Sequence, residues 1–396
     1  MELLQVVHST PAGARSASVA ATDAPAFTTT LPNDKIPVAP LVLVAVLCFA
    51  LASCSMVDDT DITKDNIKIG VVLPGQRDDA DDYVPDLSTL QCVSAINDLI
   101  SFGSGINKDR FRYIEHVDPS NEQAAYDAIH SLTNQECSII FLADSSYMSA
   151  VNKYVSNSSS DVQKSKVQYI VFNGEDNGKN IHSYTANISG AVYLSGIAAG
   201  LKAKELKVPK IGYLLKSADN LTLLNAFALG AESVYSEVKI DARVCKDVKS
   251  DCHTLVANGN VVIASDFYSR EIADNREDAF FCGFGSDKLA DCEGFICAPR
   301  YDFAQYYLNT INEVLDYDNV EYDENGKEID KSNALPEIPA YNGDYKGGAT
   351  YLSRLGTAAA PGTQETVDKS EAMILNGTFS QKVSATVPIA GITLAK

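Results

Sequence analysis

Positive charge is scarce in this chain of 396 residues. Lysine and arginine together number 32 against 52 acidic residues, which gives a formal net charge of −20. Such a body repels nucleic acid and anionic lipid, and no basic cluster or RNA-binding signature relieves the repulsion. We therefore expect no nucleic-acid partner.

Long hydrophobic runs are also missing. The longest, residues 41–52, is too short to span a bilayer but fits the apolar region of a secretory signal. It ends in Leu51-Ala52-Ser53-Cys54, which resembles the bacterial lipobox, in which the cysteine becomes the lipidated first residue of the mature chain. A buried helix that ends at a chance cysteine is the alternative. The interpretation that we favour is an exported bacterial lipoprotein held at the cell membrane through lipidated Cys54, with the periplasmic or the cell-surface face left open.

The first residues do not resemble a signal sequence. Residues 1–34 are rich in Ala, Ser, Thr and Pro and have almost no basic charge, which indicates an over-extended start. We expect disorder over residues 1–40, the signal and lipobox over 41–53, and a polar tether over 54–66.

Catalytic and metal-binding motifs are absent as well. There is no nucleophile elbow, Walker loop, dinucleotide-binding glycine fingerprint or HExxH, and the five histidines have no catalytic spacing. No CxxC occurs, and His253 beside Cys252 is weak support for zinc. We therefore predict a protein that is not an enzyme and holds neither a cofactor nor a metal.

Cysteines are frequent enough to allow disulfides. Removal of the signal and lipidation of Cys54 would leave seven, so at least one stays free. Cys245 with Cys252, or Cys292 with Cys297, would each close a small loop in an exported protein. Buried unpaired thiols are the equal alternative for Cys137 and Cys282.

The body of the chain alternates between strand and helix patterns. The expected strands are 67–73, 111–117, 137–143, 168–172, 211–215, 239–244, 260–265, 279–284 and 295–298, and the expected helices include 86–101, 121–133, 147–155, 221–236, 303–315 and 364–375. This alternation predicts parallel, doubly wound sheets with ligand groups on loops at the carboxyl ends of strands. Two sets of strands indicate two Rossmann-like lobes, which we assign to residues 67–178 with 302–335 and to 179–301 with 336–396.

The centre of the chain joins a helix rich in small residues to a strand. Gly190, Gly196 and Gly200 remove side-chain bulk, so a neighbouring element can approach closely. The order YxxNxxGAxYLxGxxAGL, KIGYL and AFxxGA, which runs from Tyr184 to Ala231, resembles the basic membrane protein family. The resemblance extends over about residues 67–387.

This resemblance implies a type I periplasmic binding fold. It also implies a substrate-binding lipoprotein of an ABC importer, with permease and ATPase subunits as partners and a purine nucleoside as the ligand between the lobes. The alternative is a surface lipoprotein that keeps the scaffold as an adhesin or ligand sensor. The acidic insert 316–345 favours that alternative.

Polar and aromatic residues at the ends of predicted strands are the candidate ligand contacts. They are Asp82, Tyr83, Asp144, Tyr147, Asn173, Phe267, Asp287 and Arg300. A flat purine needs aromatic faces, and ribose hydroxyls need polar partners. We expect Tyr83 to stack on the ligand and Asp287 and Arg300 to make the polar contacts, although these two could instead pair with each other.

The candidate positions depart from the family pattern. Residues 78–88, DDADDYVPDLS, replace a DxSFN loop, and Asn173 stands where the family has aspartate. Of the two acids in the GxDxD turn only the second, Asp287, is kept, and Arg300 replaces the lysine of an SxxK element. The resemblance therefore predicts the fold better than the ligand.

Overall fold

The computed structural model describes residues 62–77, 86–158, 166–317, 335–377 and 391–395, together with residues 325, 327, 386, 388 and 389. They form an α/β protein with parallel sheets, as the alternating pattern predicts. None of the helices in these ranges is long and apolar enough to cross a membrane. The expected disorder over 1–40, the signal over 41–53 and the lipidation site Cys54 lie outside the described residues.

The first sheet has six strands in the order β11-β5-β4-β3-β1-β2. The strands are β1 (Ile69–Val72), β2 (Phe111–Ile114), β3 (Ile139–Leu142), β4 (Gln168–Phe172), β5 (Ile181–Ala186) and β11 (Tyr341–Gly343). Every neighbouring pair is parallel. Their carboxyl ends therefore lie along one edge, where the loops after β3 and β4 carry Asp144 and Asn173.

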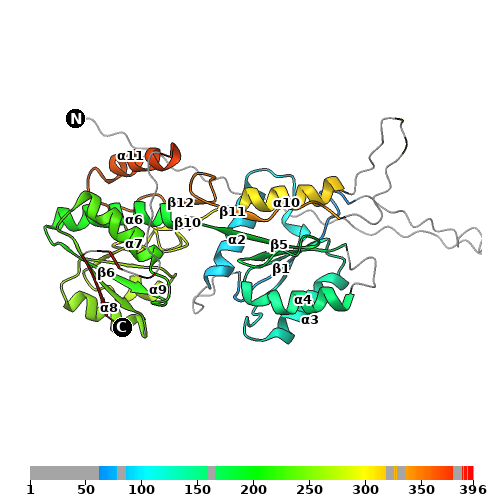
Figure 1. The fold of residues 1–396 in the computed structure, drawn as a ribbon, viewed down its shortest axis with the longest axis horizontal. Helices are drawn as coiled ribbons and strands as arrows, with labels where there is room; N and C mark the ends of the chain where they lie inside the picture. The colour runs from blue at the N-terminus through cyan, green and yellow to red at the C-terminus, as the bar shows by residue number, and fades with distance from the viewer. Residues whose placement is uncertain are drawn as a thin grey trace, which may run out of the picture. The chain divides into compact units, whose positions relative to one another are not determined.

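Helices cover both faces of this sheet (Figure 1). On one side lie α2 (Leu87–Ser101) and α10 (Ala304–Tyr317), and on the other α3 (Glu122–Asn134) and α4 (Met148–Ser158). Successive strand side chains point to opposite faces. Phe141 accordingly packs with α2 and α10, whereas Leu142 packs with α3 and α4. Both faces are buried, which explains why β1 and β3 are apolar throughout.

The second sheet has five parallel strands in the order β13-β7-β6-β8-β9. They are β6 (Lys210–Leu215), β7 (Lys239–Val244), β8 (Val262–Ser265), β9 (Phe280–Phe281) and β13 (Ile392–Ala395). One face packs on α6 (Ser189–Leu206) and α7 (Thr222–Val234). The other packs on α8 (Val248–Ala257) and α9 (Arg270–Asn275). The parts built on the first and second sheets are called lobe 1 and lobe 2 below.

The glycines of the central segment let α6 and α7 pack backbone to backbone. A Cβ atom at Gly196 would lie 2.0 Å from the carbonyl oxygen of Phe227, and one at Gly230 would lie 2.0 Å from that of Tyr193. No real Cβ fits at such distances. The close approach expected from the sequence is therefore present, and α7 is the element that makes it.

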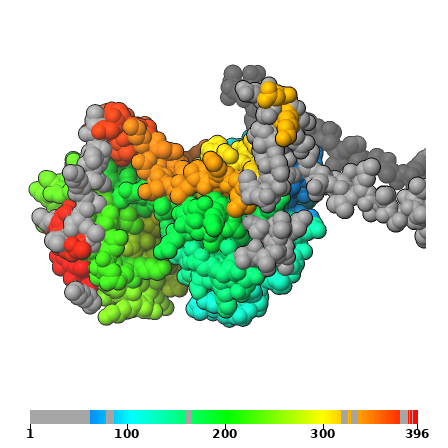
Figure 2. All heavy atoms as spheres, turned by 45° about the vertical axis from the view of Figure 1, so that its right-hand side comes forward, coloured from blue at the N-terminus to red at the C-terminus, as the bar shows by residue number. Residues whose placement is uncertain are grey.

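The C-terminal elements complete lobe 2. Helix α11 (Thr363–Leu375) contacts α6, and β13 pairs with β7 at the edge of the second sheet. In the space-filling view these residues, in orange-red and red, border the green surface of lobe 2 (Figure 2). Lobe 2 therefore depends on residues that follow α10 in the sequence.

Sheet membership changes the expected lobe boundaries. Residues 179–186 and 336–343 were assigned to lobe 2, but β5 and β11 are strands of the first sheet. The described chain passes between the lobes after β5, after β10 (Pro299–Tyr301) and between β11 and β12 (Thr350–Leu352). Backbone hydrogen bonds tie these passages together, from the Asn187 N–H to the Gly343 oxygen and from the Asp302 N–H to the Ala349 oxygen. Pairing across the sheet, which local patterns do not report, sets this boundary.

Two further expectations need correction. Residues 248–257 form α8 where the sequence suggested a polar loop between Cys245 and Cys252, and Asp247 caps this helix by accepting from the Ser250 N–H. All seven described cysteines are free thiols, so neither small disulfide is present.

Candidate functional site

The start of α2 lies against the loop that follows β3. Asp86 caps the helix by accepting from the Thr89 N–H at 3.0 Å, and Thr89 Oγ1 accepts from the Gly75 N–H at 2.9 Å. Asp144 accepts from the Ser146 N–H at 2.8 Å and from the Ser88 hydroxyl at 3.2 Å. The predicted residue Asp144 is therefore held between two elements at the carboxyl edge of the first sheet.

A second cluster centres on Arg300 of β10. Its guanidinium forms an ion pair with Asp287 and donates to the Ser94 hydroxyl of α2 at 3.0 Å. Its Cζ lies 5.1 Å from the ring centroid of Tyr351, the residue paired with it in β12. Arg300 is mostly buried, with 14% of its side chain exposed, whereas Asp287 is 43% exposed. Strands β10 and β12 form a separate two-stranded sheet that packs on α6 of lobe 2. The contact with Ser94 therefore connects lobe 2 to lobe 1.

Carboxylates surround this one guanidinium. Asp98, one turn after Ser94, accepts from the Ser94 hydroxyl at 3.4 Å. Burial and the neighbouring Asp302 carboxylate raise the pKa of Asp98, and the charge of Arg300 opposes that rise. The arrangement offers a ligand both an N–H fork and carboxylate acceptors, the groups that hydrogen-bond to hydroxyls and ring nitrogens.

The structure brings Asp287 and Arg300 together, which is the pairing that the sequence left open. Gly285 holds their two segments in register, because its N–H donates to the Pro299 oxygen at 2.7 Å. A Cβ at Gly285 would lie 2.1 Å from Leu87 of α2, and its φ is +72°. The turn before Asp287 therefore packs directly against Leu87 of lobe 1.

Two other predicted residues lie at strand ends. Asn173 is exposed after β4, has φ of 51°, and its side-chain oxygen accepts from the Thr185 hydroxyl at 2.5 Å. Phe267 follows β8, is half-buried, and packs partly on the lobe 2 core. Both lie at carboxyl edges, as expected, and no described contact joins them to the Arg300 cluster.

Tyr147 belongs to the core of lobe 1. Its side chain is fully buried, and its hydroxyl donates to the Val117 carbonyl oxygen at 2.6 Å. The ring packs among residues of α3, α4 and the sheet. The expectation that Tyr147 contacts a ligand is therefore corrected, because the helix that begins beside it turns the ring inward. Asp82 and Tyr83 lie outside the described residues.

Sequence reasoning missed residues that only the fold brings to the cluster. Ser94 and Asp98 stand four residues apart on α2, a spacing that marks one helix face but gives no sign of a partner 206 positions away. Asp266 lies at the carboxyl end of β8, beside the predicted residue Phe267. It accepts from the Lys216 N–H at 2.7 Å, and burial raises its pKa to about 6.

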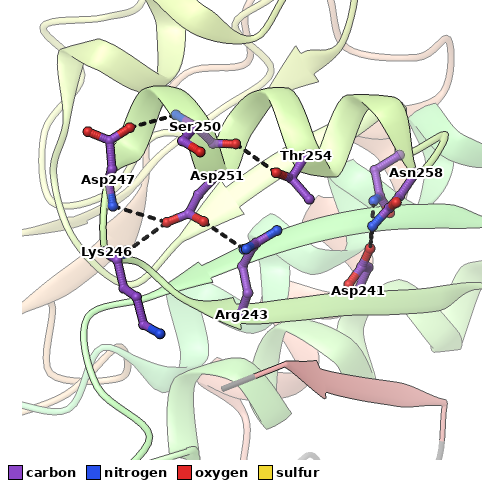
Figure 3. A network of polar contacts seen from close by, with 9 residues as sticks. Asp241, Arg243, Lys246, Asp247, Ser250, Asp251, Thr254 and Asn258 are labelled. Atoms are coloured by element: carbon purple, nitrogen blue, oxygen red, sulfur yellow. Dashed lines mark hydrogen bonds and ion pairs between the residues drawn. The ribbon is translucent and has the colours of Figure 1, made fainter.

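A surface hollow of about 530 Å³ runs along α8, lined by Asp247, Lys249, Ser250, His253, Thr254, Ala257 and Asn258. The polar network beside it is structural (Figure 3). Asp251 accepts from the N–H groups of Lys246 and Asp247 and pairs with Arg243 at 2.9 Å. Burial acts to raise the pKa of Asp251, but these contacts hold it below the ordinary value. This network fixes the start of α8 to β7 and includes none of the predicted ligand residues.

The sequence of the first half of the body matches a known family. Residues 68–251 match the model of the Bmp family, described as PnrA-like ABC transporter substrate-binding proteins. This stretch belongs to the Bmp family. The match begins in β1 and ends in α8, so it includes the resemblance carried by Tyr184 to Ala231. No curated protein matches the chain in sequence.

Solved structures share the fold of this chain. An ABC transporter solute-binding protein from Conexibacter woesei superposes with a TM-score of 0.58 at 11% identity, covering 80% of this chain and 99% of its own. A transcriptional activator of the comK gene from Bacillus halodurans gives 0.56 at 15%, covering 79% and 99%. A solute-binding protein from Aeropyrum pernix gives 0.53 at 13%, covering 79% and 92%. At these identities the likeness concerns the fold, which is that of type I periplasmic binding proteins.

The family decides the class of function. Residues 68–251 match a family of ABC transporter substrate-binding proteins, which are binding proteins rather than enzymes. Such a protein implies a small-molecule ligand, a transporter permease as partner and an extracytoplasmic location.

Proposed function

We propose that this Bmp protein binds a purine nucleoside between its lobes and delivers it to an ABC permease and its ATPase. The observation that carries the proposal is the Arg300 cluster. It joins Asp287 and Tyr351 of lobe 2 to Ser94 of lobe 1, so a ligand there would contact both lobes. Binding energy from such a ligand would favour the arrangement in which both lobes engage it.

Arg300 has donors to spare for a ligand. A guanidinium carries five N–H groups, and the described contacts of Arg300 engage Asp287 and Ser94. Hydrogen bonds from a charged donor are roughly twice as strong as neutral ones. In our proposal Arg300 and Asp287 bind polar groups of the ligand and Tyr83 supplies a stacking face. Asp82, Asp144, Asn173 and Phe267 are the further candidate contacts.

The proposal includes a lipid anchor at Cys54. The apolar run 41–52 that ends in Leu-Ala-Ser-Cys supports it, and so does the extracytoplasmic location that the family implies. Lipidation would keep the binding protein near the membrane in which its permease lies.

The test is a thermal shift of the purified full-length protein with inosine, guanosine and adenosine, confirmed by calorimetry. A ligand that binds only the folded state stabilises it by about 2.7 kcal/mol at a hundredfold excess over its dissociation constant. We expect at least one nucleoside to raise the melting temperature. Ribose and amino acids serve as controls. A rise with a sugar or an amino acid and none with nucleosides would overturn the purine assignment.

A further inference from the structure

Two buried thiols of lobe 2 lie in direct contact. Cys282 follows β9 and Cys297 precedes β10, and their Sγ atoms are 3.8 Å apart. Cys282 is 1% exposed and Cys297 is fully buried. Cys297 also lies 3.5 Å from the Ser195 hydroxyl of α6. The sequence had offered Cys292 as the partner of Cys297, but the fold places Cys282 there.

The backbone around the pair suits a covalent bond. The Gly283 N–H donates to the Cys297 oxygen and the Ile296 N–H to the Phe281 oxygen, both at 2.9 Å, so the two segments run as neighbouring strands. Neighbouring strands lie about 4.8 Å apart, within the Cα separation of roughly 4.4–6.8 Å that a disulfide bridges. A bond of about 2.05 Å then requires side-chain rotation and a small backbone adjustment.

We propose that Cys282 and Cys297 form a disulfide when the protein matures in the oxidising compartment implied by its proposed export. The reaction is thiol–disulfide exchange with a disulfide-donating oxidoreductase. One thiolate attacks the donor's disulfide to give a mixed disulfide, and the second thiolate displaces the donor. The two cysteines lose two protons and two electrons, and the donor is reduced to a dithiol.

The disulfide must form before lobe 2 has finished folding. Burial raises the pKa of the Cys297 thiol well above its ordinary value, so the folded, reduced pair holds little of the thiolate that reacts. Exposure in the folding chain removes this barrier. Once formed, the bond would close the segment 283–296, which carries Asp287, onto the strand that leads into Arg300.

Trypsin separates the two cysteines, which gives a direct test. Cleavage after Arg276, Lys288 and Arg300 places Cys282 in residues 277–288 and Cys297 in 289–300. We expect a non-reducing digest of the exported full-length protein, alkylated during purification, to yield these peptides linked. Their mass should be that of the sum minus two hydrogens, with Cys292 alkylated. Reduction should separate them.

Matched variants distinguish the pairing. The linked species should vanish in Cys297→Ser and persist in Cys292→Ser, whose cysteine lies in the same peptide. Reductant should lower the melting temperature of the wild type but not of Cys297→Ser. Alkylation of both Cys282 and Cys297 in the exported wild type, or a link that depends on Cys292, would overturn the proposal. These masses do not depend on nucleoside binding, so the result stands apart from the test of the ligand.

Discussion

Arg300 shows how one side chain can serve both the fold and a ligand. It is paired with Asp287, bonded to Ser94 and placed beside the ring of Tyr351, so its position is fixed before any ligand arrives. Preorganised donors lose little conformational freedom on binding. The carboxylate of Asp287 is partly exposed, so a ligand could replace Arg300 as one of its hydrogen-bond partners.

Arg300→Ala should weaken nucleoside binding by about 1.5–3 kcal/mol, the usual worth of a hydrogen bond to a charged group. Calorimetry on both proteins measures the difference. Arg270→Ala is the control. Arg270 is 63% exposed, and its ion pair with Asp274 on the same helix, α9, is long at 3.9 Å, so its loss should not change the affinity for the nucleoside. If Arg300→Ala binds as tightly as the wild type, Arg300 is only a structural bridge.

Asp266 should make stability depend on pH in an unusual direction. Its folded-state pKa of about 6 exceeds the ordinary value of 3.8, so between these values the folded state holds more protons than the unfolded one. The contribution of this group to stability is therefore full below about pH 4 and is lost as the pH rises through 6.

Asp266→Asn keeps an oxygen that can accept from the Lys216 N–H but cannot ionise. The variant should gain about 1–3 kcal/mol of stability relative to the wild type between pH 4 and pH 7. Urea unfolding at several pH values gives this difference, in which the other carboxylates cancel. A constant difference across the range would show that Asp266 titrates normally.

At the scale of elements, the contact between α6 and α7 defines lobe 2. The two helices meet where Gly196 faces Phe227 and Gly230 faces Tyr193, with carbonyl oxygens in the space that a Cβ would occupy. Backbone atoms cannot rotate away as side chains can. The helices must therefore separate to admit even a methyl group.

Gly230→Ala should lower the free energy of unfolding by about 1–3 kcal/mol, the usual cost of overpacking. Chemical denaturation measures it. Gly347→Ala is the matched control, because Gly347 is exposed and the nearest atom to its built Cβ is 3.4 Å away. The control should change stability by less than about 0.5 kcal/mol. Equal stability of both variants would mean that the helices adjust freely.

At the scale of the whole molecule, binding of one ligand by two lobes requires the chain to pass between them more than once. The passages after β5, after β10 and between β11 and β12 lie side by side, joined by the bonds of Asn187 with Gly343 and of Asp302 with Ala349. Several linked connections restrict how one lobe moves against the other.

Export should lipidate Cys54. Radiolabelled palmitate fed to cells that express the full chain should label the wild type and fail to label Cys54→Ser. Cys48→Ser, altered within the same apolar run, should label normally. Labelling of Cys54→Ser at the wild-type level would contradict the lipid anchor.

The sequence by itself determined the class of fold and the main helices. Apolar runs and helical periodicity are local properties, and they predicted β1, β3, α2, α3 and α10 to within a few residues. The small residues around Gly196 predicted close packing for the same reason, since the absence of a side chain can be read directly. The order from Tyr184 to Ala231 indicated the Bmp family, which the match over residues 68–251 confirms.

Only the tertiary structure decided which distant residues meet. β5 and β11 joined the first sheet through hydrogen bonds between strands far apart in the chain, Tyr147 turned into a core, and Arg300 reached Ser94 on α2. Cys297 likewise met Cys282 instead of Cys292. Such contacts depend on how sheets pair and helices pack, and neither periodicity nor spacing along one chain records that. The sequence could therefore name Asp287 and Arg300 as candidates, but it could not show that they pair.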